Sequence, residues 1–335
     1  FLYIDEAQKI PDIGLKLKLM IDEIEGLRII ISGSSALDID KSAGESLTGR
    51  KYSFNLFPFS ENEYNQVEDR IAKMDKVRER LVFGNYPELL HLPDREDKID
   101  YLNEMVSSYL LKDILAYENI KNSQKIFNLL RLIAFQIGGE ASVQELGKKL
   151  GVSKNTVEKY LDLLGKIFIL HKVEGFSRNL RKEITKNSRW YFLDNGIRNA
   201  VIANFNPVAA RNDIGALWEN YMISERLKYQ EYNRISSNNY FWRTYEQQEI
   251  DWVEEREGAL FGYEFKWKEN RAKVPPQWKN AYPTASFQVI HRDNFGEWLE
   301  ERNYSSQKKP THAHPPQPPP FQMGLAPLWR DAVPV

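Results

Sequence analysis

The sequence predicts a multidomain α/β protein that contains a helix-turn-helix unit, and three observations predict it. Near the N-terminus, two apolar segments without polar alternation are separated by one amphipathic helix, which is the order found in parallel sheets. In the middle of the chain, a short helix, a glycine turn and a second helix follow one another. After a long helix beyond residue 213, alternating segments indicate strands.

The composition limits which classes of protein and which kinds of site the chain can contain. The 335 residues include 8 Trp, 17 Tyr and 17 Phe, enough apolar side chains for two or three cores. The net charge of −1 gives no overall attraction for nucleic acid, so any basic face has to be local. Zero cysteines exclude disulfides and thiolate metal sites. No apolar run approaches the roughly 18 residues of a membrane-spanning helix, and a cytoplasmic location without membrane contact is expected.

Residues 1–60 are expected to form part of a parallel sheet covered on both faces. Strand, helix and strand are predicted in turn at Phe1–Ile4, Gly14–Glu25 and Leu27–Ile31. The first strand ends in Asp5 and Glu6, and the second runs into the polar turn 32–35. Ligands bind at this edge of open α/β sheets. The alternative is the charged start of a helix or loop after a short core strand.

Residues 61–125 are helix-rich, with one helix expected over Asp97–Glu118, and residues 126–200 form the helix-turn-helix unit. After an apolar helix over 126–137, Ser142 is expected to cap a helix of 143–150. Gly151 then makes a tight turn, and Ser153 caps a second helix, Lys154–Ile167. Two strands over 169–174 and 189–193 flank a basic loop, which makes the unit a winged helix.

The wing carries the basic charge of this unit. From His171 to Arg189 there are six Lys or Arg side chains against two acidic ones. The candidates for phosphate contacts are Arg178, Arg181, Lys182 and Lys186. Few side chains of the second helix suit base edges, so sequence-specific reading is not expected. The alternative is a winged helix that serves as a lid or protein-docking module.

Residues 213–300 are expected to form a second α/β domain. A helix and four strands are predicted at 215–230, 240–243, 249–253, 260–267 and 287–291. Alternation places Gly262, Glu264 and Lys266 on one face of a strand whose other face is aromatic. On the strand before it, Ile250 and Trp252 are expected to share a face. Residues 305–335 are rich in proline and indicate a disordered extension.

Acidic and basic side chains of this domain are expected to converge. If the two strands pair as a hairpin, Asp251, Glu264 and Lys266 lie close together, and Glu219 on the preceding helix can join them. Two or three carboxylates bind Mg²⁺, and a nearby lysine positions or deprotonates water. The alternative is a surface ion pair between Glu264 and Lys266, which contributes little.

Two resemblances follow from these residues. The Asp…Glu-x-Lys order resembles the PD-(D/E)XK nuclease superfamily, although Ile250 stands where that pattern has proline. FLYIDEAQKIP followed by RIIISGSSALDI resembles the Walker B and sensor strands of AAA+-like ATPases. With LTGR, YSFNLFPFSENEY, FGNYPELL, SSYLLKDI and EIDWV…YEFKW, residues 1–300 resemble one bacterial and archaeal family. It comprises predicted AAA+-like ATPases with a C-terminal restriction-endonuclease-like domain.

The resemblance implies a partial P-loop NTPase sheet over 1–60, a helical lid or linker over 61–125, the winged helix over 126–200 and a restriction-endonuclease-like domain over 213–300. It implies that Asp5 binds Mg²⁺ and Glu6 is the catalytic base. It also implies an ATP site with Ser34 or Ser35 as sensor and Arg50 nearby. The metal ligands of the nuclease-like domain would be Glu219, Asp251 and Glu264, with Lys266 as the catalytic lysine.

No G-x-x-x-x-G-K-[ST] phosphate loop occurs in the sequence. We therefore expect a chain that starts halfway through a nucleotide-binding domain. We also expect that it does not hydrolyse ATP by itself, because the loop makes most of the contacts that bind the phosphates. The expected function is that of a fragment of an AAA+-like ATPase that couples nucleotide state to DNA, a protein partner or a second copy. The alternatives are a non-enzymatic binding protein and a Mg²⁺-dependent nuclease.

Overall fold

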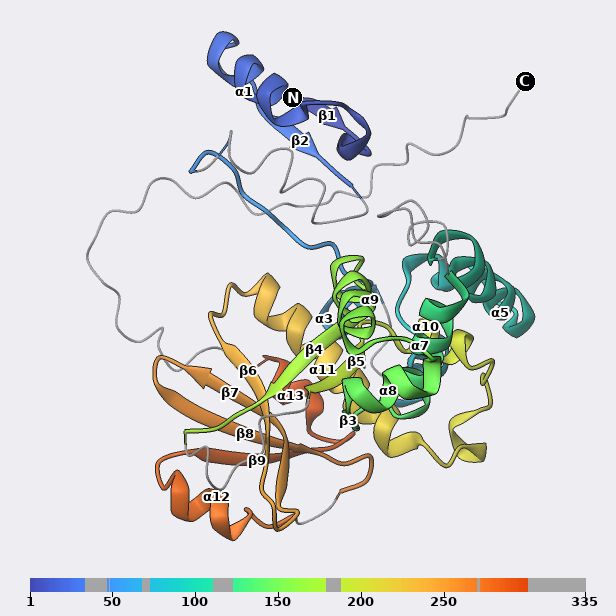
Figure 1. Cartoon of the computed structure of the whole chain (residues 1–335), viewed down its shortest axis with the longest axis vertical. Coiled ribbons are helices and arrows are strands. Elements are labelled where there is room, and N and C mark those ends of the chain that lie inside the picture. Colours follow the sequence, from blue (N-terminus) through green and yellow to red (C-terminus); the bar gives the residue numbers. More distant parts are fainter. Residues whose placement is uncertain are drawn as a thin grey trace. The chain divides into compact units, whose positions relative to one another are not determined.

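The computed structural model describes residues 1–33, 47, 49–67, 73–110, 123–178, 188–269 and 272–300 (Figure 1). Phe1–Leu299 form one compact unit, and Glu300–Val335 form a second, of which only Glu300 is described. The extension predicted over 305–335 therefore lies outside the described residues. Within the described ranges, no helix has the length and apolar character needed to cross a membrane.

The N-terminal part is a small parallel sheet. β1 (Leu2–Ile4) pairs with β2 (Ile29–Ile31), and η1 (Ala7–Lys9) and α1 (Ile13–Glu23) connect them. The parallel pairing predicted from the apolar pattern is confirmed. The predicted cover on both faces is wrong, because the paired residues Tyr3 and Ile30 are 62% and 45% exposed.

A helical stretch follows. Its elements are α3 (Glu61–Val67), α4 (Lys73–Phe83), η3 (Pro87–Leu90), α5 (Arg95–Glu104), the π-helix η4 (Met105–Leu110) and α7 (Ser123–Phe135). The single helix predicted over Asp97–Glu118 is therefore α5 continued by a π-helical turn, and its last residues lie outside the described part of the chain.

The helix-turn-helix pattern gives two capped helices. After β3 (Glu140–Ala141), Ser142 Oγ accepts a hydrogen bond from the Glu145 amide at the start of α8 (Val143–Leu150). Ser153 Oγ accepts from the Thr156 amide at the start of α9 (Lys154–Lys166). Gly151 ends α8 with φ 61°, a left-handed conformation that glycine adopts without strain. Both predicted caps and the glycine turn are confirmed.

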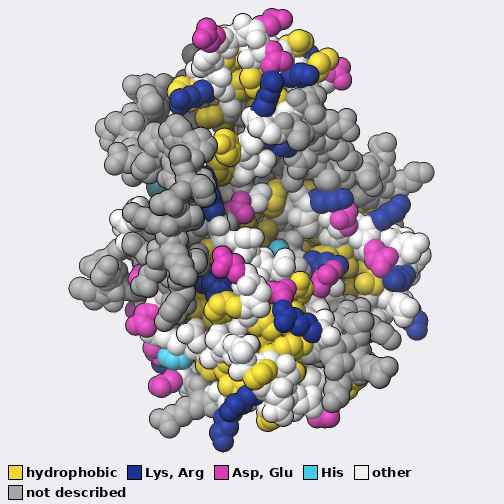
Figure 2. All heavy atoms as spheres, turned by 90° about the vertical axis from the view of Figure 1, so that its left-hand side faces the viewer, with side chains coloured by type: hydrophobic (Ala, Val, Ile, Leu, Met, Phe, Trp, Pro, Cys, Tyr) yellow, Lys and Arg dark blue, Asp and Glu magenta, His cyan; other side chains and the backbone are white. Residues whose placement is uncertain are grey.

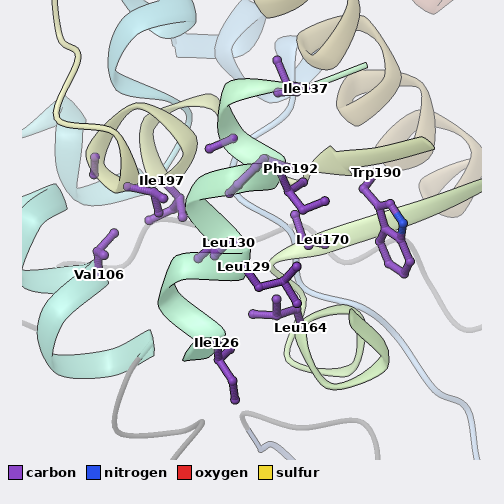
Figure 3. Close-up of a cluster of buried hydrophobic side chains, with 14 of the residues drawn as sticks. Val106, Ile126, Leu129, Leu130, Ile137, Leu164, Leu170, Trp190, Phe192 and Ile197 are labelled. Carbon is purple, nitrogen blue, oxygen red and sulfur yellow. The ribbon is translucent and has the colours of Figure 1, made fainter. Parts of the chain in front are cut away.

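An antiparallel hairpin and one core complete this middle part. β4 (Leu170–Gly175) pairs with β5 (Ser188–Phe192), which also pairs with β3, and α10 (Asn195–Val201) follows. Figure 3 shows side chains of α7 packed among those of α9, the hairpin and α10. The buried side chains labelled there are Val106, Ile126, Leu129, Leu130, Ile137, Leu164, Leu170, Trp190, Phe192 and Ile197.

The C-terminal part extends the same sheet. Its elements are η5 (Val208–Ala210), α11 (Ile214–Tyr232), β6 (Asn238–Arg243), β7 (Glu249–Arg256), β8 (Ala259–Phe265), α12 (Pro276–Ala281), β9 (Ser286–Ile290) and α13 (Phe295–Glu300). β4 pairs in parallel with β6 through two residue pairs, Glu174 with Tyr240 and Gly175 with Phe241. The seven strands therefore form one mixed sheet in the order β3-β5-β4-β6-β7-β8-β9.

Helices cover both faces of the C-terminal strands. On one face, α11 and α13 bury Trp218, Trp252 and Phe265 in one cluster. On the other face, Trp278 of α12 packs against Trp242, whose ring centroid is 5.3 Å away, and against Ile250. The sheet is thus the middle of three layers over this region.

A β-bulge in β7 breaks the predicted alternation. Tyr240 faces Val253 but Trp242 faces Ile250, so two residues of β7, Asp251 and Trp252, lie opposite one residue of β6. The prediction that Ile250 and Trp252 share a face is wrong, because they belong to clusters on opposite faces. The bulge lies at one of the predicted metal ligands, Asp251.

Two glycines at the second position of their helices provide a matched test of this packing. A Cβ at Gly196 of α10 would lie 2.0 Å from the Phe83 carbonyl oxygen, whereas one at Gly215 of α11 would meet nothing within 4 Å. We expect Gly196→Ala to lower the free energy of unfolding by about 2–3 kcal/mol or more, since the obstacle is backbone. Gly215→Ala should be neutral or stabilise by up to about 1 kcal/mol. Equal values in urea unfolding would contradict the close contact between α10 and α4.

Candidate functional site

The predicted carboxylates lie close together at the bulge of β7. Asp251 is 5% exposed, and its Oδ2 accepts a hydrogen bond from the Phe265 amide at 2.9 Å, at the end of β8. Glu264 Oε1 is 2.6 Å from Lys266 Nζ, and the two side chains are 13% and 38% exposed. Glu219 projects from the first half of α11 and interacts electrostatically with both carboxylates. The structure therefore brings together all four residues predicted for this site.

A guanidinium lies among these carboxylates. Arg189 of β5 is 4% exposed, and its Nη2 is 2.8 Å from Glu249 Oε2. Its Nη1 is 3.7 Å from Glu219 Oε1 and 3.8 Å from Asp251 Oδ1. We refer to Arg189, Glu219, Glu249 and Asp251 as the Arg189 cluster. The guanidinium carbon also lies 4.6 Å from the ring centroid of Phe241, within the range of a cation–π interaction.

The Arg189 cluster is covered from the side of α7 and β5. Tyr191 of β5 donates a hydrogen bond from its hydroxyl to Glu219 Oε1 at 2.6 Å. Gly138, just after α7, has φ 75°, and a Cβ there would lie 2.9 Å from the same carboxylate oxygen. Glu219 is thus enclosed by a tyrosine, an arginine and a backbone turn.

Burial sets the protonation of these groups. Burial, and then the neighbouring carboxylates Glu219 and Glu264, raise the pKa of Asp251 well above its usual range. Burial also raises the pKa of Glu219, although Arg189 and the Tyr191 hydroxyl partly offset it. For Lys266, burial would lower the pKa, but the bond to Glu264 and the charges of Asp251 and Glu219 raise it. Lys266 is therefore an ammonium and is not poised to act as a base at neutral pH.

The donor atoms of the predicted metal site suit Mg²⁺, but their arrangement does not fit it. Carboxylate oxygens are the right ligand type. Nevertheless, no group of three or more acidic or histidine side chains in the described ranges is arranged to hold a metal ion. Asp251, Glu264 and Glu219 instead bind a backbone amide, a lysine, and a tyrosine with an arginine, respectively.

The second predicted site lies at the ends of β1 and β2. Asp5 Oδ1 accepts hydrogen bonds from Ser32 Oγ and, at 3.0 Å, from the Glu6 amide. Glu6 has φ 51° and lies 3.3 Å from Lys9 Nζ through Oε2. The carboxylate and the hydroxyl that end the two strands are thus in contact. They are oxygen ligands of the type that Mg²⁺ takes.

The remaining predicted residues are dispersed. Arg50 lies 2.5 Å from Asp22 of α1 and is not in contact with Asp5. Arg178 lies 2.6 Å from Glu255 of β7, so it is held against the sheet. The other candidates, Ser34, Ser35, Arg181, Lys182 and Lys186, lie outside the described residues.

Three residues of the site, Arg189, Tyr191 and Glu249, could not be assigned to it from any specific pattern in the sequence. Arg189 was expected only as one of several basic residues of the wing, and Tyr191 only as part of the strand 189–193. Glu249 shares the alternation of β7 with Asp251, which is the one pattern that points toward it. Placing Arg189 at the carboxylates requires knowledge that β4 joins β6.

The pH dependence of stability tests the charge of the Arg189 cluster. The folded protein holds a proton on Asp251 more tightly than the unfolded chain does, so this stabilisation is present below about pH 4 and is lost as pH rises through the raised pKa. Asp251→Asn keeps an oxygen to accept from the Phe265 amide. We expect its stability relative to wild type to increase by about 1 kcal/mol or more between pH 4 and pH 8.

Asp213 provides a control of opposite sign. Burial opposes its charge, but hydrogen bonds from Arg211 and Arg198 outweigh burial and lower its pKa to about 2. Its contribution is present above about pH 4 and is lost as pH falls toward 2, so Asp213→Asn should lose stability relative to wild type as pH rises from about 2 to 4. Denaturant unfolding of both variants and wild type from about pH 2 to about pH 8 measures both changes. A difference for Asp251→Asn that does not change with pH would contradict the prediction.

Comparison with known proteins gives three family matches. A AAA domain model matches residues 1–65. Two models described as domains of unknown function, DUF8612 and DUF4143, match residues 74–208 and 214–302. No solved structure matches the chain significantly.

Similar curated proteins occur in bacteria and archaea. The uncharacterized protein Rv2008c of Mycobacterium tuberculosis is 25% identical over 266 residues, covering 78% of this chain and 58% of that protein. The uncharacterized protein MJ1544 of Methanocaldococcus jannaschii is 21% identical over 268 residues, covering 75% of this chain and 58% of that protein. The chain thus spans less than two thirds of the length of these relatives. The match at residues 1–65 supports an AAA-like, ATPase-related family.

Proposed function

We propose that this chain is part of an AAA-like ATPase that couples nucleotide state to the binding of DNA or a protein partner. In this proposal, residues 1–60 belong to the ATPase core and 61–125 form a helical lid or linker. Residues 126–200 form a winged helix and 213–300 a restriction-endonuclease-like domain. ATP and Mg²⁺ are the cofactors of the complete nucleotide site.

One observation supports the proposed coupling between the ATPase core and the C-terminal part of the chain. The segment Phe59–Glu61, which spans the end of the proposed ATPase core, is bound to α11 through buried polar groups. The Glu61 amide donates to Glu225 Oε2 at 2.7 Å, and Lys228 Nζ donates to the Phe59 carbonyl at 2.9 Å. Since Glu225 and Lys228 are buried and charged, these bonds resist exchange with water. A displacement of this segment would therefore be transmitted to α11.

The Asp5–Ser32 contact supports the nucleotide end of the proposal. In the complete site, Mg²⁺ would supply electrostatic stabilisation of the phosphates, and Asp5 would hold it. Glu6 would orient and activate water. Ser34 or Ser35 would act as the sensor, with Arg50 assigned to the same nucleotide site. Because the sequence contains no phosphate loop, this chain is not expected to hydrolyse ATP alone.

The basic loop supports the DNA-binding end. Arg181, Lys182 and Lys186 belong to it, whereas Arg178 is engaged by Glu255. On the face drawn in Figure 2, the described Lys and Arg side chains alternate with Asp and Glu and form no patch of one sign. On this face, DNA contact would therefore depend on the loop rather than on a broad basic surface. If substitutions in the loop leave DNA binding unchanged, a protein partner or a second copy of the chain would take the place of DNA in this proposal.

A Mg²⁺-dependent nuclease is the second candidate, and one observation favours it. Glu219, Asp251, Glu264 and Lys266 converge from α11, β7 and β8, and the pKa of two of the carboxylates is raised, as in many functional sites. The contacts that these carboxylates already make, to a backbone amide, to Lys266, to Tyr191 and to Arg189, argue against a nuclease.

Two loop residues test DNA binding. Replacing Arg181 and Lys182 by serine should weaken binding to duplex DNA about equally for all sequences. Each phosphate contact contributes about 0.9 to the slope of log K against log salt, so the slope should fall by about 2. The matched control replaces two exposed lysines of α1, Lys16 and Lys18, and should leave the slope unchanged. Fluorescence anisotropy at several salt concentrations measures both. An unchanged slope in the loop variant would remove the wing from the proposal.

Plasmid cleavage tests the second candidate. We expect wild-type protein with Mg²⁺ to leave supercoiled plasmid intact, because Lys266 and the carboxylates are engaged with one another and with Arg189. Asp251→Ala and Lys266→Ala, purified in parallel, should behave as wild type does. Nicking by wild type that requires Mg²⁺ and disappears in both variants would establish the nuclease instead.

A further inference from the structure

The position of Arg189 is unusual for a strand residue. It belongs to β5, and β4 and β6 lie between β5 and β7 in the sheet order. Its guanidinium nevertheless passes over the Phe241 ring of β6 and reaches Glu249 and Asp251 of β7. A long side chain at 4% exposure that spans this distance loses much conformational freedom, so its charge contacts have to compensate.

The charge balance at the Arg189 cluster is that of a cation site. Three carboxylates, from α11 and β7, converge on the guanidinium at distances of 2.8–3.8 Å. Two of the three lie beyond hydrogen-bond length from it, so they act on Arg189 mainly through charge. Burial alone would lower the pKa of Arg189, but Tyr191 and the three carboxylates outweigh it and raise the pKa.

We propose that Arg189, and not a divalent cation, neutralises Glu219, Glu249 and Asp251, and thereby closes the nuclease-like site. The guanidinium takes the place that Mg²⁺ would need, and Tyr191 and the Gly138 turn cover the same carboxylate of Glu219. The Arg189 cluster then connects the winged helix, through β5, to the C-terminal strands. This inference goes beyond the proposed function and depends on other residues than the basic loop.

Divalent cation binding with matched arginine variants tests the inference. Arg189→Met keeps an apolar stem over Phe241 and removes the charge that three carboxylates share. Arg226→Met is the control, because Arg226 is equally buried but is paired with the single carboxylate Glu254, through Nε at 2.6 Å. Both variants should be less stable than wild type.

Only Arg189→Met should respond to a cation. We expect its melting temperature to rise with Mn²⁺ or Mg²⁺ and its affinity for Mn²⁺, measured by electron paramagnetic resonance, to exceed that of wild type at least about tenfold. Wild type and Arg226→Met should show no such response. Adding Asp251→Asn to Arg189→Met should abolish the gain, which assigns it to the Arg189 cluster.

Two outcomes would overturn the inference. One is Mn²⁺ binding by wild type that is lost in Asp251→Asn, a measurement that does not depend on whether Arg189→Met folds. The other is a folded Arg189→Met, judged by circular dichroism, that binds Mn²⁺ no better than wild type. An unchanged salt slope of DNA binding in the loop variant bears on the proposed function alone, so the two proposals fail separately.

Discussion

The burial of charge along α11 is the constraint on which the rest of this structure depends. Glu225, Arg226 and Lys228 are each exposed by no more than 2%, so each needs a partner where it lies. Glu225 accepts from the Glu61 amide and Asn85, Arg226 binds Glu254 and the Trp298 carbonyl, and Lys228 binds Glu225 and the Phe59 carbonyl. One helix therefore fixes the segment Phe59–Glu61, the strand β7 and the last helix, α13, at the same time.

Such pairs specify an arrangement more than they stabilise it. Removing one member of a buried pair costs about 3–5 kcal/mol, whereas replacing the whole pair by apolar groups is often neutral. An apolar α11 could slide over the sheet, because apolar contacts are not directional. Arg226 and Glu254 can satisfy each other in one register only, with Nε and Nη2 at 2.6 and 3.0 Å from the two carboxylate oxygens. The register of α11 on β7 then determines where Glu219 lies, because Glu219 precedes Arg226 by about two helical turns and lies on the same side of the helix.

Local features of this fold could be predicted from the sequence, and long-range ones could not. Ser142, Ser153 and Gly151 act on residues within four positions, so their roles are visible in the chain itself. The pairing of β4 with β6 joins residues more than sixty positions apart, and no spacing in the sequence indicates it. The grouping of Asp251, Glu264 and Glu219 was accessible because a helix and a hairpin suffice to form it. Arg189 was not, because its place depends on that β4–β6 pairing.

The same pairing limits how the parts of the chain can move. β4 and β6 share only two residue pairs, which alone would allow the β3–β5 side of the sheet to hinge against the β6–β9 side. Two arginines cross this junction: Arg189 reaches Glu249 of β7, and Arg243 of β6 lies 2.7 Å from Glu140 of β3. Unit charges about 4 Å apart interact by about 4 kcal/mol at an effective dielectric constant of about 20, so hinging would have to separate both pairs against this attraction. Both ion pairs therefore oppose hinging at the β4–β6 junction, and Arg189 connects α11 and β7 to β5.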